Sequence, residues 1–262
     1  MQISVIVPTY KPQNFLWQCL DSLDAQTLDK RLWEVIVVLN GCCEPWKSEI
    51  EQYQMEHPVL PLRLIQTDEA GVSNARNIGI DHATGEYITF MDDDDYVSPT
   101  YLEELAKIAD RDTIAASYTI GFSDEQPYIP YYLEKEYNRR AKAGKQPFYK
   151  AKKYFGGPCM KMIHRDIIGE QRFDTRFQNG EDSLFMFAIS PRISHVQFTS
   201  KEAVYYRRFR IGSATKTYTR KQAISNGWKL IGQYSRLFHK GSYNWYFYLT
   251  RILGVLHRIL VN

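Results

Sequence analysis

Short apolar runs alternate with helical patterns along the N-terminal part of the chain. Four of these runs have the length of a strand and contain β-branched or aromatic residues, which predicts strands buried within a sheet. They are Ile3–Val7, Val35–Leu39, Leu62–Ile65 and Tyr87–Met91. Apolar residues at helical spacing predict helices from about Gln13 to Gln26 and from Gly71 to Ala83. This alternation predicts an α/β fold with a mostly parallel central sheet.

The pattern is less regular further along the chain. A helix near residues 102–108 is followed by an expected strand at Ile114–Tyr118. From residue 126 to residue 154, prolines and basic residues interrupt the periodicity. We expect this segment to be an insertion or a mobile lid outside the core. A later helix is expected to begin at Gly180.

Two helices are expected at the C-terminal end, and the last has an apolar stripe. Its members are Trp245, Leu249, Ile252, Leu253, Leu256 and Leu260. Arg251 and Arg258 lie off the stripe. A helix of this kind packs on its own core, packs on a partner chain, or lies in a membrane interface.

Charge is distributed unevenly along the chain. The net charge is only +3, but residues 201–262 contain 12 Lys and Arg against one acid, Glu202. This excess predicts an anionic partner at the C-terminal end. No nucleic-acid-reading motif accompanies the charge, so we expect no nucleic acid as partner. An anionic membrane surface or a diphosphate-bearing substrate fits better.

The composition is that of a globular protein. The 262 residues are 44% hydrophobic, enough for one large α/β domain with an elaboration. The four cysteines include no CxxC pair, which favours reduced thiols and a cytoplasmic location. Neither a signal-peptide core nor an apolar stretch long enough to span a membrane is apparent in the sequence.

Four consecutive acids, Asp92 to Asp95, follow the apolar run that ends at Met91. Open α/β sheets bind ligands at the carboxyl ends of their strands. Carboxylates crowded there repel one another unless a cation compensates, and Mg²⁺ prefers such oxygen ligands. The alternative is a solvated acidic turn before the helix that follows Pro99. The position directly after a buried strand favours a metal site.

The first strand ends in Pro8, Thr9 and Tyr10, and no glycine-rich phosphate loop follows it. Both a dinucleotide-binding fingerprint and a P-loop are therefore excluded there. An aromatic ring and a hydroxyl at a strand end can contact a nucleobase, or they form an ordinary turn.

Five segments taken together resemble the family 2 glycosyltransferases. They are residues 3–10, residues 34–41, the segment from Gly71 to Ile80, the segment from Gly85 to Asp95 with its DXD motif, and residues 179–182 with an ED motif. The resemblance covers roughly residues 1–215 and implies a GT-A fold, a Rossmann-like three-layer sandwich. It implies a nucleotide-binding part at about 1–120 and an acceptor-side part at about 121–215. Residues 216–262 would be a basic, amphipathic helical extension.

The resemblance also implies roles for individual residues in binding the donor. Pro8, Thr9, Tyr10 and Asn40 would surround the base, Arg76 would lie near the nucleotide, and Asp93 would lie near the ribose. Asp94 would bind Mg²⁺ or Mn²⁺ at the diphosphate, with Asp92 nearby. Arg210 or Arg207 would pair with phosphate oxygens. Because many relatives have two acids where this chain has Leu39 and Asn40, the base preference is open, with uridine the first choice.

On the acceptor side, the resemblance makes Asp182 the general base of a single, inverting displacement. Helix capping is the alternative role for Asp182, since Gly-Glu-Asp before an apolar run also begins a helix well. His164 and Arg165 follow a segment that resembles the acceptor-side wall, although a structural role suits them equally.

The sequence thus predicts an inverting, metal-dependent transferase that moves a sugar from a nucleoside-diphosphate sugar, UDP-linked as first choice, to a saccharide or lipid-linked acceptor. It would act in cell-surface polysaccharide synthesis, in the cytoplasm or on the inner face of the cell membrane. The alternatives are an inactive nucleotide-sugar-binding scaffold and, less favoured, a sugar nucleotidyltransferase, which would need a basic glycine-rich loop after the first strand.

Overall fold

The computed structural model describes residues 2–210 and 219–261. Eight strands form the central sheet, and their spatial order is β3-β2-β1-β4-β9-β6-β10-β8. In that order they are Leu62–Thr67, Trp33–Asn40, Ile3–Thr9, Tyr87–Phe90, Lys161–His164, Thr113–Ala116, His195–Phe198 and Gln146–Pro147. The α/β fold class and the mostly parallel sheet are confirmed.

The first four strands of the chain that join this sheet are parallel neighbours. Strand β1 pairs with β2 on one side, where Thr9 lies opposite Leu39, and with β4 on the other, where Ile6 lies opposite Phe90. The strands are apolar along their length because both faces of the sheet are covered. Their carboxyl ends therefore meet at one edge, and the acids after β4 lie beside the ends of β1 and β2.

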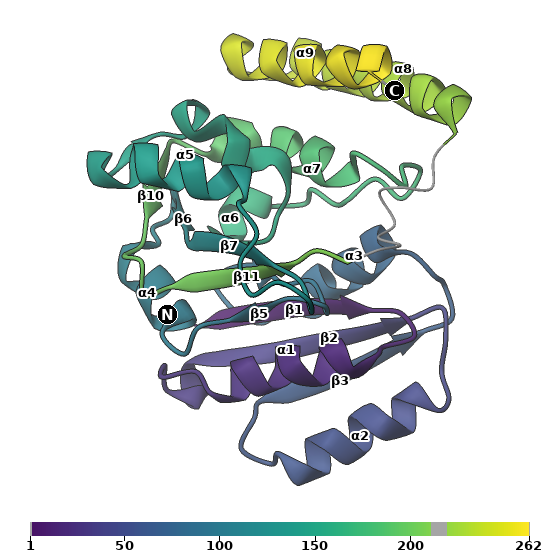
Figure 1. The fold of residues 1–262 in the computed structure, drawn as a ribbon. Coiled ribbons are helices and arrows are strands. Elements are labelled where there is room, and N and C mark those ends of the chain that lie inside the picture. The colour runs from purple at the N-terminus through teal and green to yellow at the C-terminus, as the bar shows by residue number, and fades with distance from the viewer. Residues whose placement is uncertain (1, 211–218, 262) are drawn as a thin grey trace.

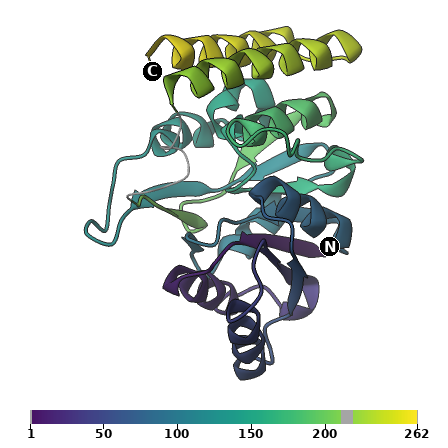
Figure 2. The same ribbon diagram turned by 90° about the vertical axis from the view of Figure 1, so that its right-hand side faces the viewer.

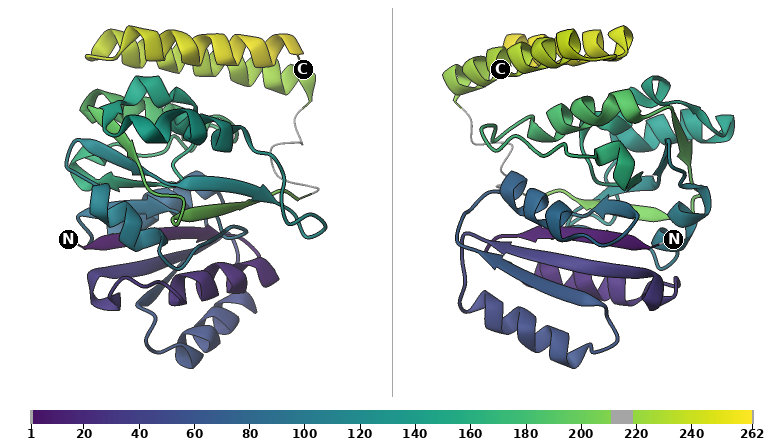
Figure 3. Two further views of the ribbon diagram at one scale, coloured as in Figure 1. Left: turned by 60° about the vertical axis from the view of Figure 1, so that its left-hand side comes forward. Right: turned by 180° about the vertical axis from the view of Figure 1, so that it is seen from behind.

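Helices cover both faces of this half of the sheet (Figure 1). Helix α1 (Asn14–Asp24) lies on one face and α3 (Val72–His82) on the other, as the two views of Figure 3 show. This is the expected three-layer arrangement. Helix α2 (Trp46–Glu56), beside β3, was not predicted, because only Ile50 and Tyr53 of its eleven residues are buried and its apolar periodicity is weak.

A second, smaller sheet of order β5-β11-β7 is formed by Tyr96–Val97, Val204–Arg208 and Tyr118–Phe122. The strand expected at Ile114–Tyr118 is in fact two, since Ser117 separates β6 in the large sheet from β7 in the small one. Several helices are short. They are η1 (Lys30–Leu32), α4 (Tyr101–Ile108), α6 (Arg165–Ile168), α7 (Glu181–Ile189) and η4 (Ser190–Arg192).

The expectation that residues 126–154 lie outside the core is wrong. This segment forms α5 (Tyr132–Arg140), η2 (Ala141–Ala143), β8 and the start of η3 (Phe148–Gly156). Its aromatic and aliphatic side chains belong to the core, namely Leu133, Tyr137, Phe148 and Tyr154. The prolines do not keep this segment out of the core. Two of them precede α5, and Pro147 lies in an edge strand, where a missing N–H breaks no pairing.

The C-terminal residues form a hairpin of two long helices, α8 (Arg220–Lys240) and α9 (Trp245–Val261). The two helices lie side by side over the part of the molecule that contains α5 and α7 (Figures 1 and 2). No helix within the described ranges has the length and apolar character needed to cross a membrane. The domain boundary expected near residue 215 falls outside the described residues.

The inward face of α9 is not its apolar stripe. Phe247 and Val255 are buried, and Arg251 between them donates to Ser183 Oγ at 3.1 Å and to the carbonyl of Lys152 at 2.7 Å. Of the stripe, Leu253 is 62% exposed and Leu260 79% exposed. The helix thus has two apolar faces. The face with Phe247 and Val255 packs on the core, and the exposed part of the stripe lies on the other face.

Candidate active site

A cavity of about 350 Å³ lies at the carboxyl edge of β1 and β2. Six residues predicted to bind a donor are among those that line it, namely Pro8, Thr9, Tyr10, Asn40, Asp93 and Arg210. We call it the first pocket. The aromatic ring of Tyr10 is half-exposed at 51%, so its face is available for stacking.

Hydrogen bonds between neighbouring elements shape the floor of the first pocket. Thr9 Oγ1 donates to Asp93 Oδ2 at 2.6 Å, which ties the end of β1 to the acidic run. Asn40 Nδ2 donates to the carbonyl of Thr9 at 2.7 Å, and the N–H of Gly71 donates to Asn40 Oδ1 at 2.8 Å. Asn40 therefore fixes the backbone of two loops with its amide and keeps one N–H and one lone pair for a ligand.

The acidic run divides its side chains between different tasks. Asp93 turns towards Thr9, whereas carboxylate oxygens of Asp92, Asp94 and Asp95 lie within 4.8 Å of one another. Asp94 pairs with Arg210, whose Nε lies 2.8 Å from Oδ2. Burial, with repulsion from Asp92, raises the pKa of Asp94, and burial with repulsion from Asp94 and Asp92 raises the pKa of Asp93 to about 6.

Asp95 is the buried member of the group, at 3% exposure. Its Oδ1 accepts the N–H of Arg208 at 2.7 Å, and the Arg208 guanidinium donates to the carbonyl of Asp94 at 2.9 Å. Burial and the charges of Asp92 and Asp94 raise the pKa of Asp95 well above its usual range. Asp95 was not predicted individually, and only its link to β11, distant in sequence, reveals this position.

These acids fit a divalent cation. Three carboxylates supply the hard oxygen donors that Mg²⁺ and Mn²⁺ take. Repulsion between these carboxylates adds to burial, the larger cause, in raising the pKa of Asp94 and of Asp95. A bound divalent ion would relieve it.

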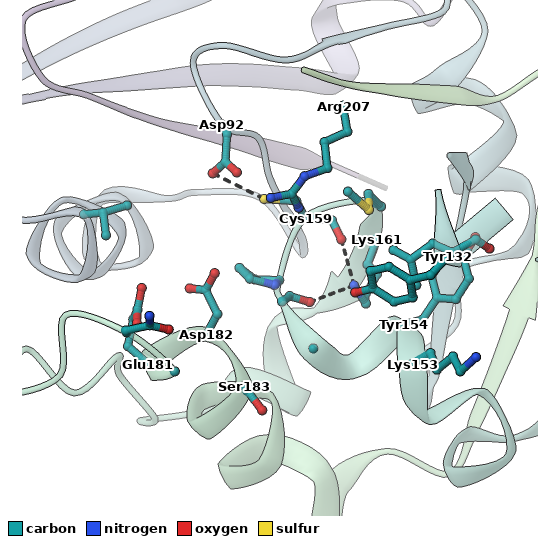
Figure 4. A pocket seen from close by; sticks show the side chains of 18 of the residues that line it. Asp92, Tyr132, Lys153, Tyr154, Cys159, Lys161, Glu181, Asp182, Ser183 and Arg207 are labelled. Atoms are coloured by element: carbon teal, nitrogen blue, oxygen red, sulfur yellow. Dashed lines mark hydrogen bonds between the residues drawn. The ribbon is translucent and has the colours of Figure 1, made fainter. Parts of the chain in front are cut away.

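A second cavity, of about 300 Å³, adjoins the first and shares Val72 with it. Asp92 and Asp182 face each other across this second pocket, and Glu181 lies beside Asp182 (Figure 4). Arg207 enters from β11, and Tyr132 and Lys153 come from the segment that was expected to be a lid. Arg258 of α9 also lines the pocket, so the C-terminal hairpin contributes to its wall.

Arg76 connects the acidic run to Asp182. Its Nη2 lies 2.8 Å from Asp92 Oδ1 and its Nη1 lies 2.6 Å from Asp182 Oδ1, with only 4% of its side chain exposed. Burial alone would lower the pKa of Arg76, but the carboxylates of Asp182 and Asp92 outweigh it and raise it. Arg76 is thus a permanent cation between the two acids.

Asp182 is the second residue of α7, and this helix begins directly after Gly180, whose φ is +90. Glu181 and Asp182 lie in the first turn of α7, as the sequence predicts for a helix start, and the Asp182 carboxylate also pairs with Arg76. A role at the start of the helix and a role in the site are therefore compatible. Burial raises the pKa of Asp182 against the opposing charge of Arg76, which makes the carboxylate a better proton acceptor. Burial and the charge of Asp182 raise the pKa of Glu181 to about 7.

Two residues considered for the acceptor side lie elsewhere. His164 is paired in register with Tyr87, at the end of β4 opposite to the acidic run. Arg165 donates to the carbonyls of Gly85 and Ala83, so it holds the turn before β4. Both have structural roles.

The chain is similar in sequence to known glycosyltransferases. The model of the family described as Glycosyl transferase family 2 matches residues 4–171. A Campylobacter jejuni relative, described as GalNAc(5)-diNAcBac-PP-undecaprenol beta-1,3-glucosyltransferase, is 26% identical over 214 residues, which are 82% of this chain and 67% of that protein. Two further relatives are named as glycosyltransferases, and the match with this chain spans only 32% and 64% of their own lengths.

Two solved structures have the same fold. The crystal structure of S. aureus TarS in complex with UDP-GlcNAc superposes with a TM-score of 0.76 at 20% identity and covers 100% of this chain and 73% of that chain. The mannosyltransferase PcManGT from Pyrobaculum calidifontis, in complex with GDP-Man and Mn²⁺, has a TM-score of 0.67 at 18% identity and covers 98% of this chain and 69% of that chain. The expected GT-A fold is confirmed.

Proposed function

The chain belongs to glycosyl transferase family 2, and from that premise we propose that it transfers a sugar from a nucleoside-diphosphate sugar to a hydroxyl group. The acceptor is a saccharide or a lipid-linked glycan in cell-surface polysaccharide synthesis. One observation carries the proposal most of all. Two adjoining pockets, one suited to a nucleotide and one holding the half-buried Asp182, are joined through Asp92, Arg76 and Asp182.

The first pocket holds the nucleotide. Pro8, Thr9 and Tyr10 lie against the base, Asn40 offers its remaining N–H and lone pair, and Asp93 accepts from the ribose. The Arg210 guanidinium leaves Asp94 and pairs with the diphosphate. UDP is the first choice of nucleotide, which the UDP-GlcNAc complex of the TarS neighbour supports. The GDP-Man complex of the other neighbour makes guanine the competing base.

Asp94 and the neighbouring acids would hold Mg²⁺ or Mn²⁺, and the Mn²⁺ complex of PcManGT supports this choice. When bound, such a cation would stabilise the negative charge that grows on the departing diphosphate. Asp92 belongs to the group of three acids and also pairs with Arg76, so the cation site and the second pocket are coupled electrostatically.

Asp182 acts as the general base in the second pocket. It takes the proton from the acceptor hydroxyl while that oxygen forms a bond to the anomeric carbon. The bond between the anomeric carbon and the diphosphate oxygen breaks, and the electron pair leaves with the diphosphate. One displacement inverts the anomeric configuration and needs no covalent enzyme intermediate. Arg76 holds the Asp182 carboxylate in position and neutralises part of its charge.

The acceptor enters the second pocket among Tyr131, Tyr132, Lys153 and Arg258. Aromatic rings suit sugar faces, and the cations suit an acceptor that carries phosphate. The undecaprenol-linked substrate named for the Campylobacter relative supports a lipid-linked acceptor. We expect the protein to work in the cytoplasm at the inner face of the cell membrane, an expectation that its four free cysteines support.

An inactive nucleotide-sugar-binding scaffold is the competing hypothesis. Thermal stabilisation by a panel of nucleoside diphosphates and their sugars, each with and without Mn²⁺, tests donor binding. Saturating ligand at 100 Kd stabilises the native state by roughly 2.7 kcal/mol. We expect a metal-dependent shift with one nucleotide, which Asp94→Ala abolishes. No shift with any member of the panel would refute the transferase and the scaffold together, and a shift without detectable transfer would favour the scaffold.

A further inference from the structure

Apolar side chains gather on the outer surface of the C-terminal hairpin. Of the fourteen large hydrophobic side chains that are exposed in the described residues, six belong to α8 and α9. They are Trp228, Trp245, Tyr246, Leu249, Leu253 and Leu260. Tyr246 lies against η3, where its hydroxyl accepts from Lys152 Nζ at 2.9 Å, so the outer surface holds the other five. The hairpin forms the outermost layer of the molecule, with nothing in the described chain above it (Figures 1 and 2).

Three of these residues lie on the side of α9 that faces away from the core. Trp245, Leu249 and Leu253 recur every four residues, so they form one stripe along the helix. Phe247 and Val255 occupy the opposite, buried side. On α8, Gly227 is packed against Val255 and Ile259 of α9, and the next residue, Trp228, is 58% exposed.

The charge around the stripe has a single sign. Residues 219–262 contain seven Lys and Arg and neither Asp nor Glu. Five of the seven are exposed on α8, namely Arg220, Lys221, Lys229, Arg236 and Lys240. Tryptophan and leucine beside a row of cations are typical of helices that lie flat in a membrane interface, and cations near the surface are attracted to anionic lipids.

We propose that the outer face of the α8–α9 hairpin, defined by five apolar residues (Trp228, Trp245, Leu249, Leu253 and Leu260) and the five basic residues of α8, docks onto an anionic lipid membrane. A second copy of the chain is a poorer occupant, because two such faces would bring like charges together around the apolar contact. The hairpin lies flat, with its apolar stripe at the headgroup boundary.

This docking surface would bring the proposed transferase to its acceptor, and that role rests on the proposed function. The same helix that carries the stripe extends Arg258 to the second pocket and Arg251 to Ser183, next to Asp182. A membrane under the hairpin therefore brings the acceptor pocket close to the headgroups, where the anionic group of a lipid-linked acceptor lies.

Co-sedimentation of the full chain with vesicles tests the proposal. We expect binding to phosphatidylglycerol vesicles, weakened by salt, and much weaker binding to phosphatidylcholine vesicles. The double variant Leu249→Glu with Leu253→Glu should lose vesicle binding. The matched control is Met55→Glu with Val59→Glu, two residues 74% and 70% exposed on another part of the surface, which should bind as the wild type does. Reversing Lys229 and Arg236 to Glu should weaken binding to anionic vesicles roughly fivefold or more per charge.

Two further readouts keep the outcomes separate. Each variant is compared with the wild type in donor-induced thermal shift, which should be unchanged because the substituted residues touch neither pocket. Sedimentation equilibrium without lipid reports the oligomeric state. Equal vesicle binding by the Leu249/Leu253 double variant, or no binding by the wild type, would overturn the proposal. A wild-type dimer that the same double variant dissociates, without vesicle binding, would assign the face to a second copy. Vesicle binding without any donor shift would leave the docking surface standing and refute the transferase.

Discussion

The acidic edge of the sheet and the C-terminal hairpin use charge in opposite ways. At the sheet edge, Asp92 to Asp95 are crowded and largely buried, and each is held by a specific partner, among them Thr9, Arg76 and Arg210. Of the seven cations on the hairpin, six are exposed, and residues 219–262 contain no acid. Buried charges need fixed partners, whereas exposed charges need only solvent or a diffuse field. The first region is built to bind defined chemical groups, and the second to meet a surface.

The strongest test of this contrast removes the cation at the centre of the site. Arg76→Met leaves Asp92 and Asp182 facing each other without compensation, and breaking a buried pair in this way costs about 3–5 kcal/mol of stability. Urea denaturation measures the loss. The control Arg111→Met removes an exposed partner of Asp166 and should cost less than about 1 kcal/mol. Equal losses for the two variants would show that Arg76 is an ordinary surface cation.

A second substitution asks whether the hairpin is part of the folded core on its inner side. Phe247 is fully buried against Phe148 and Phe187. Phe247→Ala should reduce the free energy of unfolding by about 3–5 kcal/mol, through lost burial and the cavity left behind. Leu253→Ala, on the exposed stripe of the same helix, should change it by less than about 0.5 kcal/mol. If both substitutions are silent, the hairpin does not dock on the core as described.

The pH dependence of stability distinguishes a buried cation from an exposed one. Burial lowers the pKa of Lys161, which is 1% exposed, to about 7, and its Nζ donates to the carbonyls of Gly157 and Cys159. Between pH 7 and the unfolded pKa of about 10.4, the unfolded chain binds the extra proton, so this group makes stability rise with pH. Relative to Lys161→Met, the wild type should gain about 1–2 kcal/mol between pH 7 and pH 8.5. Denaturation curves that stay parallel over this interval would contradict the lowered pKa.

The smallest expected effect on stability concerns Arg210, which is 41% exposed beside Asp94. Arg210→Ala should change the free energy of unfolding by less than about 1 kcal/mol but weaken donor binding roughly tenfold, since a charge-assisted contact to phosphate is lost. Titration calorimetry with the donor and Mn²⁺ measures the affinity. The control Arg176→Ala, which breaks the exposed pair with Asp174, should leave affinity unchanged. An unaltered donor affinity in Arg210→Ala would remove this residue from the site.

Much of the nucleotide-binding half could be predicted from the sequence because its information is local. Apolar runs such as Val35–Leu39 specify buried strands, and parallel pairing then brings Thr9, Asn40 and Asp92 to one edge. The grouping of Pro8, Thr9, Tyr10, Asn40, Asp93 and Arg210 around one pocket follows from that topology and from β11.

The part of the molecule around the second pocket was harder to predict because its contacts depend on packing between elements that are distant in sequence. Tyr132, Lys153 and Arg258 come from three different helices, α5, η3 and α9, and meet only in the folded chain. Tyrosine and lysine bury rings and methylene stems while their polar ends stay accessible, so the segment 126–154 was not recognisable as core. The inward orientation of Arg251 was equally hidden, since only its contacts with Ser183 and Lys152 make a buried arginine favourable.

The most direct test of the central claim, that Asp182 is the base in a pocket joined to the donor site, is to measure both transfer and donor binding in Asp182→Asn. The substitution keeps the shape of the side chain and removes its ability to accept the proton. We predict that transfer falls by about 10²–10⁴-fold, while the affinity for the donor with Mn²⁺ stays within about threefold of the wild type, a change well under one hydrogen bond. Transfer at the wild-type rate by Asp182→Asn would contradict the account.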